Sequence, residues 1–487
     1  MEGNGSDHTL QSERAEDEQL EKQCKDSGHE KDENQALRGT SGDEERNSPE
    51  IPPLPVGLFD PSLKGVRKEV AKKWALTVLI LFCFILCVLS LYWAVLFHVP
   101  QNLSALTVAV VSFDGRFSPF EGTTPLVGDA VKQPAREQAS LPAYALSYRV
   151  EPPEKYGGDP IAVRQAVYDE HVWAAIIVNA NATVLLQRAV ASGNSSYSPL
   201  GGGQIFVNSA RDETTYANYI NPQLFEFRVN VVAMFGEQWN TLNPAIGFSS
   251  FDLRPFAPAQ ATPAVTIGLI YLIIIAFVSF SFFLPVYTKF LIPKCHPPLH
   301  FWALVLFRLF MTTAAYLLMS LAYSLVSLAF LIPFSNKYPH NDTTMAKDPD
   351  AYGHATFVGY WMLNWVGMYA LGLASENVTM IIGQPWTALW LIFWVISNVS
   401  TAFYAISLAP GFFQFGYAWP LYRIVNASRT ILFDTHSRIG LNLGVLLAWR
   451  AVNILLFPFR CVFMRWKTNK ELMRTSRRRK IQYLVDG

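Results

Sequence analysis

Long apolar runs recur along the chain after its first seventy or so residues. The first run covers Trp74–Phe97. About 24 residues in a helix, at 1.5 Å per residue, suffice to cross roughly 30 Å of hydrocarbon. A long hydrophilic segment precedes this run and no small-residue cleavage pattern follows it, so we interpret it as a retained anchor rather than a cleaved signal. Basic residues just before the run predict a cytosolic N-terminus: Arg67, Lys68, Lys72 and Lys73.

Five more apolar runs of span length follow, and together with the first they predict six crossings with both termini in the cytosol. They lie at about 265–287, 302–332, 355–374, 385–408 and 437–459. Segment 99–263 and the loops near 334–352 and 409–436 then face outward. The sequence therefore predicts a polytopic α-helical membrane protein.

The hydrophobic pattern changes between Val99 and Pro263. Short apolar runs at 107–113 and 172–179 predict strands. Patterns at 182–192 and 212–239 predict helices, the second of them broken or kinked at Pro222. We therefore predict an α+β extracytosolic domain between spans one and two. The five cysteines all lie outside it, so it must fold without disulfides: Cys24, Cys83, Cys87, Cys295 and Cys461.

The two ends of the chain carry opposite charge. Residues 1–50 hold 15 Asp/Glu against 6 Lys/Arg and almost no apolar run, which predicts a disordered acidic cytosolic arm. The tail is rich in Lys and Arg, which suits the anionic inner leaflet. The predicted organisation is an arm 1–55, a juxtamembrane segment with the first span 56–98, an outer domain 99–263, five spans 264–460 and a basic cytosolic tail 461–487.

Sequons offer a separate check of this topology. Five N-x-S/T motifs fall in segments predicted to face outward: Asn102, Asn181, Asn194, Asn341 and Asn426. We expect at least one of them to be glycosylated.

Motifs of hydrolytic or nucleotide chemistry are absent from the sequence. There is no GxxxxGK[ST], HExxH or GxSxG motif, so we expect no enzyme activity, no cofactor, no metal and no nucleic-acid partner. The glycines at 201–203 lack the Lys and Ser/Thr of a phosphate loop, and we interpret them as a turn. Cys83 and Cys87 are spaced i, i+4, but no third ligand is near, which favours ordinary membrane residues over a metal site.

Polar residues form stripes inside three predicted spans, each on one helix face. They are Thr313, Tyr316, Ser320, Tyr323 and Ser327, then Ser397, Ser400, Tyr404 and Ser407, then Asn442, Trp449 and Asn453. Such stripes must turn away from lipid. Two interpretations stay open, namely hydrogen-bonded helix packing, aided by the GxxxG of Gly440 and Gly444, and a polar transport path.

Charged residues inside the spans are rarer. Arg308 lies near the inner end of a run of about 30 residues, so we expect its side chain to reach the inner interface. Arg450 lies near mid-bilayer and needs a partner. Glu376 is the only carboxylate between Gly353 and Tyr422. We therefore predict a Glu376–Arg450 pair, acting either as a gate or as a structural tie.

Several segments resemble the fungal nitrosoguanidine-resistance protein family. They are GLFDPSLKGVRKEV (57–70), SLYWAVLF (90–97), VAVVSFDG (108–115), SARDETTYANYINP (209–222) and the five-span C-terminal half. The resemblance covers roughly 55–465, and Ala94 stands where the family usually has glycine. It implies a fungal plasma-membrane protein linked to tolerance of toxic compounds, similar also to the bacterial phage-infection-protein group and to type-2 ABC exporter permeases. No catalytic residues can be carried over.

Two functional hypotheses follow. The first is an exporter-like plasma-membrane protein that contributes to drug resistance or lipid distribution without its own ATPase. Its partners would be membrane lipids and a lipophilic cargo, and analogy with exporter permeases implies a homodimer and a separate ATPase. The alternative is a non-transporting regulator or scaffold that recruits partners through its cytosolic arm and tail. The aromatic stretch 409–438 fits an interfacial belt, or alternatively a lip for lipid entry.

Overall fold

The computed structural model describes residues 90–139, 145–239, 246–289, 301–334, 352–383 and 386–485, except positions 98 and 333, with scattered positions between 61 and 88. The predicted arm 1–55 and most of the first predicted span lie outside these ranges. The chain divides into two units. Met1–Leu79 with Lys289–Leu299 contains few described positions, whereas Ile80–Thr288 with His300–Gly487 contains the features that follow, apart from Lys289 at the end of a helix.

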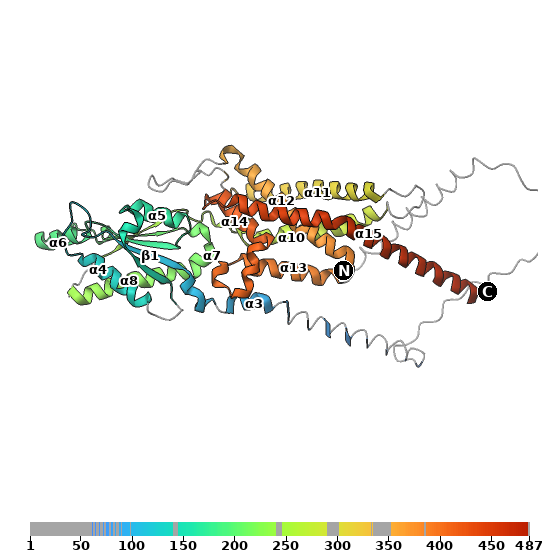
Figure 1. Ribbon diagram of the computed structural model, residues 1–487, viewed down its shortest axis with the longest axis horizontal. Coiled ribbons are helices and arrows are strands. Elements are labelled where there is room, and N and C mark those ends of the chain that lie inside the picture. Colours follow the sequence, from blue (N-terminus) through green and yellow to red (C-terminus); the bar gives the residue numbers. More distant parts are fainter. Residues whose placement is uncertain are drawn as a thin grey trace, which may run out of the picture. The chain divides into compact units, whose positions relative to one another are not determined.

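The region after α3 (Ser90–Phe97) forms a five-stranded sheet in the order β2-β1-β3-β4-β5 (Figure 1). We call residues 107–254, which hold these strands and the helices between them, the sheet domain, and the helices from α9 onward the helical region. The strands are β1 (Thr107–Ser112), β2 (Ser147–Glu151), β3 (Ala174–Val178), β4 (Gly203–Val207) and β5 (Phe248–Asp252). Only the β3–β4 pair is antiparallel. The predicted strands at 107–113 and 172–179 are confirmed as β1 and β3.

Helices cover both faces of this sheet. Side chains alternate along β1, so Val108 and Val110 pack on one face while Ala109 and Val111 pack on the other. Figure 1 shows α5 on one side and α4 and α8 on the other. The bounds are α4 (Leu126–Ala139), α5 (Pro160–Tyr168), α6 (Ala182–Ser192), α7 (Glu213–Thr215) and α8 (Asn221–Trp239). Strands and helices alternate along the chain and three strand pairs are parallel, an arrangement closer to α/β than to the predicted α+β.

Two helix predictions for this region hold. The helix predicted at 182–192 is α6. The one predicted at 212–239 is broken near Pro222, since a π-helical turn at Tyr216–Ile220 comes immediately before α8. The wider π-helical turn lies just before Pro222, which has no N–H to donate to the preceding turn.

The remainder is helical and apolar. Its elements are α9 (Thr262–Val265), α10 (Ile270–Lys289), α11 (Phe301–Ala329), α12 (Thr356–Ile382), α13 (Thr387–Ala402), α14 (Pro420–Phe433) and α15 (Ile439–Val485). Within the described part of the chain, α11 and residues 439–467 of α15 are long and apolar enough to cross a membrane. A third span results if Ala259–Val265 and Ile270–Phe283, bent by 51°, count as one. The protein is thus mostly helical, with two to three helices of span quality.

The predicted run 385–408 is shorter in the structure. Helix α13 ends at Ala402, and the chain continues into a 3-10 turn at Ile406–Leu408, just before Pro410. The predicted stripe on this run is therefore wrong at its outer end, because Tyr404 and Ser407 lie beyond the helix. The apolar pattern of the sequence continues beyond Ala402, although the backbone leaves the helix there.

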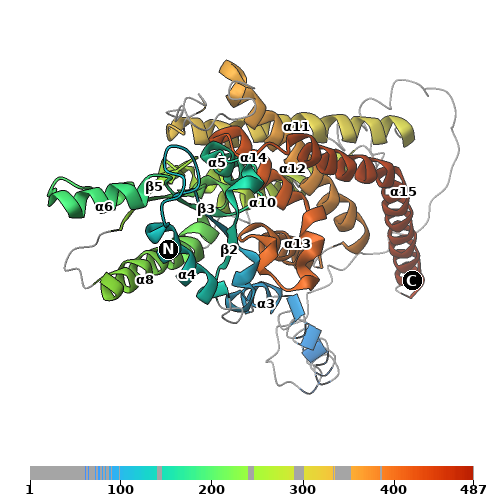
Figure 2. The same ribbon diagram turned by 60° about the vertical axis from the view of Figure 1, so that its left-hand side comes forward.

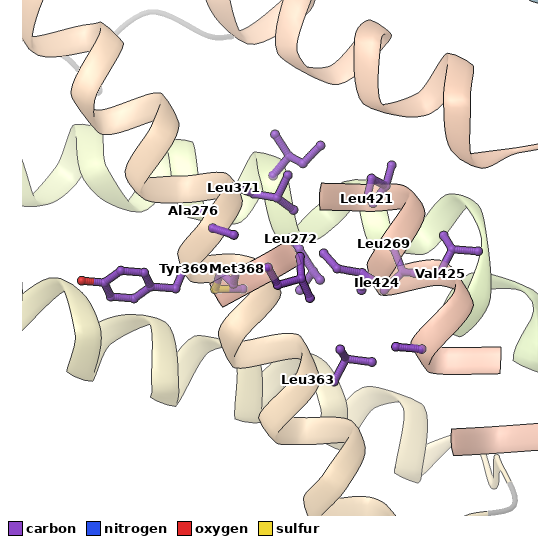
Figure 3. Packing of buried hydrophobic residues seen from close by; sticks show 14 of the residues in the cluster. Leu269, Leu272, Ala276, Leu363, Met368, Tyr369, Leu371, Leu421, Ile424 and Val425 are labelled. Carbon is purple, nitrogen blue, oxygen red and sulfur yellow. The ribbon is translucent and has the colours of Figure 1, made fainter. Parts of the chain in front are cut away.

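The helical region has its polar residues inside and many apolar residues outside. On α11 the buried face includes Arg308, Thr312, Ser320 and Ser324, whereas Leu306 on the same helix is exposed. Figure 3 shows the apolar part of the core, where residues of α12 such as Leu363 and Met368 lie close to α14 and α10. Exposed apolar surface on span-length helices is typical of contact with lipid.

Candidate functional site

A charge pair lies at the centre of the helical region. Arg308 of α11 donates from Nη2 to Oε1 of Glu376 on α12 at 2.5 Å, and the two side chains are 0% and 1% exposed. Nη1 of Arg308 also faces Sδ of Met380 at 3.4 Å and Sγ of Cys461 at 3.8 Å. The guanidinium of Arg308 lies 5.1 Å from the ring centre of Phe457, so α15 also packs against this charge pair.

Two predictions about these charges are wrong. Arg308 does not extend to an interface, and the partner of Glu376 is Arg308 rather than Arg450. The physical reason is helix rotation, because Arg308 shares the buried i, i+4 face of α11 with Thr312 and Tyr316. That face points toward α12.

Arg450 of α15 interacts with aromatic rings instead of a carboxylate. Its guanidinium lies 4.6 Å from the ring centre of Tyr369 and 5.5 Å from that of Trp365. The two rings are four residues apart on α12 and therefore share one helix face. Cation–π attraction of this kind contributes about 0.5–2 kcal/mol, depending on desolvation.

A pair of asparagines joins the same two helices. Nδ2 of Asn377 donates to the backbone oxygen and to Oδ1 of Asn453, both at 3.0 Å. Nδ2 of Asn453 donates to the carbonyl of Trp449 at 2.8 Å. Asn442 lies three turns away on α15, where it accepts a hydrogen bond from Nη1 of Arg423 at 3.3 Å.

Hydroxyl groups of the predicted stripes mainly bond to their own helices. Thr313 donates to the carbonyl of Leu309 at 2.6 Å, Ser320 to that of Leu317 at 3.0 Å, and Ser397 to that of Trp394 at 3.2 Å. Ser397 also accepts from Nε1 of Trp419 at 3.2 Å. These contacts fit the helix-packing alternative for these three residues.

One segment of helix α12 brings together four of the predicted residues, namely Tyr316, Glu376, Arg450 and Asn453. From Tyr369 to Asn377 it meets Arg450, Tyr316, Arg308 and Asn453 in succession. The ring of Tyr316 meets that of Tyr369 edge-on at 6.0 Å, and a Cβ built on Gly372 would lie 2.4 Å from the Tyr316 hydroxyl. We call Arg308, Tyr316, Tyr369, Glu376, Asn377, Arg450 and Asn453 the polar cluster. Asn442 and Tyr404 are not part of it.

The GxxxG motif has no packing role within the described residues. A Cβ built on Gly440 or Gly444 meets nothing within 4 Å. The interpretation of this motif as a packing aid is therefore wrong for contacts within the described residues.

An apolar cavity of about 640 Å³ lies beside α9, α10 and α11. Its lining is Gln260, Pro263, Ala264, Gly268, Tyr271, Ile275, Met319, Ala322, Tyr323, Val326, Ser327, Phe330 and Ile332. The Tyr323 hydroxyl donates to the carbonyl of Pro263 at 3.4 Å. Two stripe residues, Tyr323 and Ser327, thus belong to this cavity.

A second cavity, of about 300 Å³, is polar and lies between the sheet domain and α14. Its lining includes Arg211, Arg429, Arg438 and Glu170, together with Tyr404. Sequence reasoning missed these arginines, because Arg211 and Arg429 are 218 positions apart.

Two ion pairs join the sheet domain to α14 and the residue that follows it. Arg429 of α14 pairs with Asp212 at 3.2 Å, and Arg254 pairs with Asp434 at 2.9 Å. All four side chains are at most 14% exposed. Truncating one partner of such a pair leaves a buried charge unpaired, so these contacts hold the two regions in one register.

The predicted sequons have different surroundings. Asn194 is exposed, while Asn102 donates from Nδ2 to the carbonyl of Leu408 at 2.9 Å. Asn181 is the N-cap residue of α6. Asn426 lies inside α14 and the serine of its motif, Ser428, is fully buried, so this sequon is not accessible. Asn341 lies outside the described residues.

Comparison with known proteins finds a matching family model and a relative that is named as a membrane protein. The chain is 24% identical over 466 residues to an "Uncharacterized endoplasmic reticulum membrane protein" of Saccharomyces cerevisiae, with 86% of each chain covered. No solved structure matches it. Residues 77–455, well over half of the chain, match the family model "Protein of unknown function (DUF3533)". With its span-length helices and its membrane relative, this chain is a membrane protein that belongs to the DUF3533 family.

Proposed function

We propose that the protein binds lipids or lipophilic toxicants within its membrane region and moves or distributes them across the bilayer, without an ATPase of its own. The observation that carries this proposal is the apolar cavity beside α9, α10 and α11. A volume of about 640 Å³ falls within the range of roughly 300–1,000 Å³ that is typical of small-molecule sites.

The residues at the rim of the apolar cavity favour entry of a lipid directly from the bilayer. Tyr271, Val326 and Phe330 line the cavity and are also exposed, whereas Ala264 on its wall is buried. If these exposed side chains face lipid, an acyl chain can pass from the bilayer into the cavity without crossing water. The carbonyl of Pro263 and the hydroxyl groups of Tyr323 and Ser327 offer polar contacts to a head group.

In this proposal the polar cluster acts either as a gate for transport or as a structural tie between helices. The buried Arg308–Glu376 ion pair joins α11 to α12, while Arg450 and Asn453 join α15 to α12. A change in the separation of α11 and α12 must therefore break or remake the ion pair. Removing water from two charges is costly and their mutual attraction repays that cost only in good geometry. An arrangement of the helices that keeps the Arg308–Glu376 pair would therefore differ sharply in free energy from one that breaks it.

The proposal includes six crossings, a sheet domain on the outer side and both termini in the cytosol. The sequence resemblance to nitrosoguanidine-resistance proteins, phage-infection proteins and ABC exporter permeases is what supports this topology. The same resemblance supports a homodimer and a separate ATPase partner. The resemblance favours the plasma membrane, whereas the name of the yeast relative states the endoplasmic reticulum for that protein. Fluorescent tagging of the full chain distinguishes the two locations.

Filling the apolar cavity tests the proposal. Ala322→Trp places an indole in the cavity, and Leu325→Trp is the matched control, since Leu325 is an exposed residue of α11 outside the cavity lining. The purified full chain is reconstituted in vesicles that contain a fluorescent phospholipid, and dithionite quenching then measures how fast the label crosses the bilayer. Binding of the same lipid is measured in detergent.

The expected result is loss of binding and of crossing in Ala322→Trp alone. The indole would occupy space that the lipid needs, so lipid binding should weaken about tenfold or more, which corresponds to at least about 1.4 kcal/mol. Equal binding in Ala322→Trp and Leu325→Trp would remove the cavity from the proposal. Crossing at the protein-free rate in every protein, despite binding, would reduce the proposal to lipid binding.

The scaffold alternative rests on the length of α15. Its 47 residues correspond to about 70 Å of helix, more than twice the roughly 30 Å of hydrocarbon. Figure 2 shows its C-terminal part running away from the other helices. Truncation after Lys467 that abolishes toxicant tolerance in cells, yet leaves lipid crossing intact in vesicles, would favour recruitment by this helix.

A further inference from the structure

Two adjoining polar cavities lie between the sheet domain and α14, of about 300 Å³ and 40 Å³. They share Glu170, Arg211, Tyr422, Asn426, Arg429 and Arg438, so we treat them as one arginine cavity. Arg423 lines its smaller part and Asp212 its larger part.

Positive charge is in excess around the arginine cavity. Its walls carry four arginines and two carboxylates. Asp212 is matched by Arg429 at 3.2 Å and Glu170 by Arg438 at 3.5 Å. The two carboxylates are thus each in contact with another arginine, so Arg211 and Arg423 add two positive charges in excess of the lining carboxylates.

Arg429 presents unused hydrogen-bond donors. Its side chain is only 4% exposed, and Nη1 donates to Oδ2 of Asp212 at 3.2 Å and to the carbonyl of Arg211 at 2.9 Å. Nε and Nη2 are buried and have no hydrogen-bond partner among the described residues. A buried charged donor without an acceptor is costly, so this position favours an acceptor that enters the cavity.

Arg211 is held in place with its charge poorly compensated. Its guanidinium stacks on the ring of Trp173 at 3.7 Å, and Nη1 donates to the carbonyl of Val172 at 3.0 Å. Burial lowers the pKa of Arg211, and neighbouring Glu170 only partly opposes this effect. An anion beside Arg211 would stabilise the charged guanidinium.

We propose that the arginine cavity binds a phosphate or phosphate-ester group. Two rigid guanidiniums from different elements, Arg211 after β4 and Arg429 on α14, can direct paired N–H groups at several oxygens of one tetrahedral anion. A volume of about 300 Å³ accommodates such a group at the lower end of small-molecule sites. The inference does not depend on lipid crossing, because the site is separate from the apolar cavity.

Two sources share this chemistry, an anionic phospholipid head group and a soluble phosphate. Tyr404 and Ser407, just beyond the end of α13, line the cavity, so a head group at the membrane edge can reach it. The same lining also carries Arg211, Arg429 and Arg438, which suit a soluble anion equally well.

The test uses the full chain in a mild non-ionic detergent. Inorganic phosphate, dihexanoyl phosphatidic acid and dihexanoyl phosphatidylcholine are titrated, and binding is followed by calorimetry and by the midpoint of thermal unfolding. The variants are Arg211→Gln and Arg438→Gln, the latter at the more exposed rim. Arg116→Gln is the matched control, since Arg116 is an exposed arginine of the sheet domain, paired with Glu154 at 3.4 Å away from the cavity.

We expect phosphate to bind the native chain and Arg116→Gln equally, and Arg211→Gln at least about tenfold more weakly. Tighter binding of phosphatidic acid, with displacement of phosphate, assigns the site to a lipid head group. Binding of phosphate alone assigns it to a soluble phosphate ester. Should Arg211→Gln fail to fold, phosphate protection of Arg211 from phenylglyoxal in the native chain replaces it. Absence of binding by all three probes, or equal affinity in Arg211→Gln and Arg116→Gln, overturns the proposal.

Discussion

The Arg308–Glu376 pair gives the most direct test of the helical core. Glu376→Leu leaves the guanidinium of Arg308 at 0% exposure without its carboxylate. Breaking a buried pair from one side costs about 3–5 kcal/mol, because an uncompensated charge stays in a low-dielectric interior. Arg308→Met removes the opposite charge and should cost a similar amount.

The double variant separates pairing from simple loss of packing. If the two residues acted independently, Arg308→Met with Glu376→Leu would cost about 6–10 kcal/mol, the sum of the single effects. Replacement of a buried pair by apolar groups of similar volume is often close to neutral. We therefore expect the double variant to be several kcal/mol more stable than that sum.

The measurement is reversible unfolding of the full chain in mixed micelles, followed by tryptophan fluorescence. Arg450→Met is the control, because Arg450 interacts with the rings of Tyr369 and Trp365 and its loss should cost about 0.5–2 kcal/mol. Additive effects of the two single variants would contradict the pairing. So would an Arg450→Met variant that is less stable than Glu376→Leu.

Two further predictions address helix packing and topology. Gly372→Val should destabilise the chain by about 1–3 kcal/mol or more, because a Cβ there would lie 2.4 Å from the hydroxyl of Tyr316, whereas Gly444→Val, with open space around it, should be neutral in thermal unfolding. Asn194→Gln should abolish a glycosidase-sensitive gel shift in a eukaryotic host, because Asn194 is the exposed sequon of the sheet domain, while Asn426→Gln should leave the shift unchanged. A shift unaffected by Asn194→Gln would argue against an outward-facing Asn194 that carries a glycan.

Local patterns predicted the elements of the fold better than their arrangement. Strands β1 and β3 and helix α6 follow from periodicity within a few residues, so the sequence indicated them directly. The sheet order and its parallel pairs depend on contacts between distant segments, which periodicity does not contain. The end of α13 was misplaced because apolar residues continue beyond the last helical one.

The charge partners show a similar division. The sequence places Glu376 inside a span, but its predicted pairing with Arg450 rests on depth in the membrane and on the lack of another carboxylate between Gly353 and Tyr422, not on helix rotation. The rotation of α11 about its axis determines which charge meets Glu376. The i, i+4 spacing of Arg308, Thr312 and Tyr316 in the sequence indicates that these three residues share one helix face. The arginine cavity could not be found in this way, because its residues come from segments far apart in the sequence.

Helix α14 packs against both the other helices of the helical region and the sheet domain. Its side chains contribute to the membrane core with α10 and α12, and its Arg429 together with the adjacent Asp434 fastens the sheet domain. A chimera that exchanges the sheet domain between relatives should therefore fold only if the block from Pro420 to Arg438 travels with it. The unit that can be exchanged between relatives therefore comprises two separate segments of the chain, the sheet domain and the block from Pro420 to Arg438.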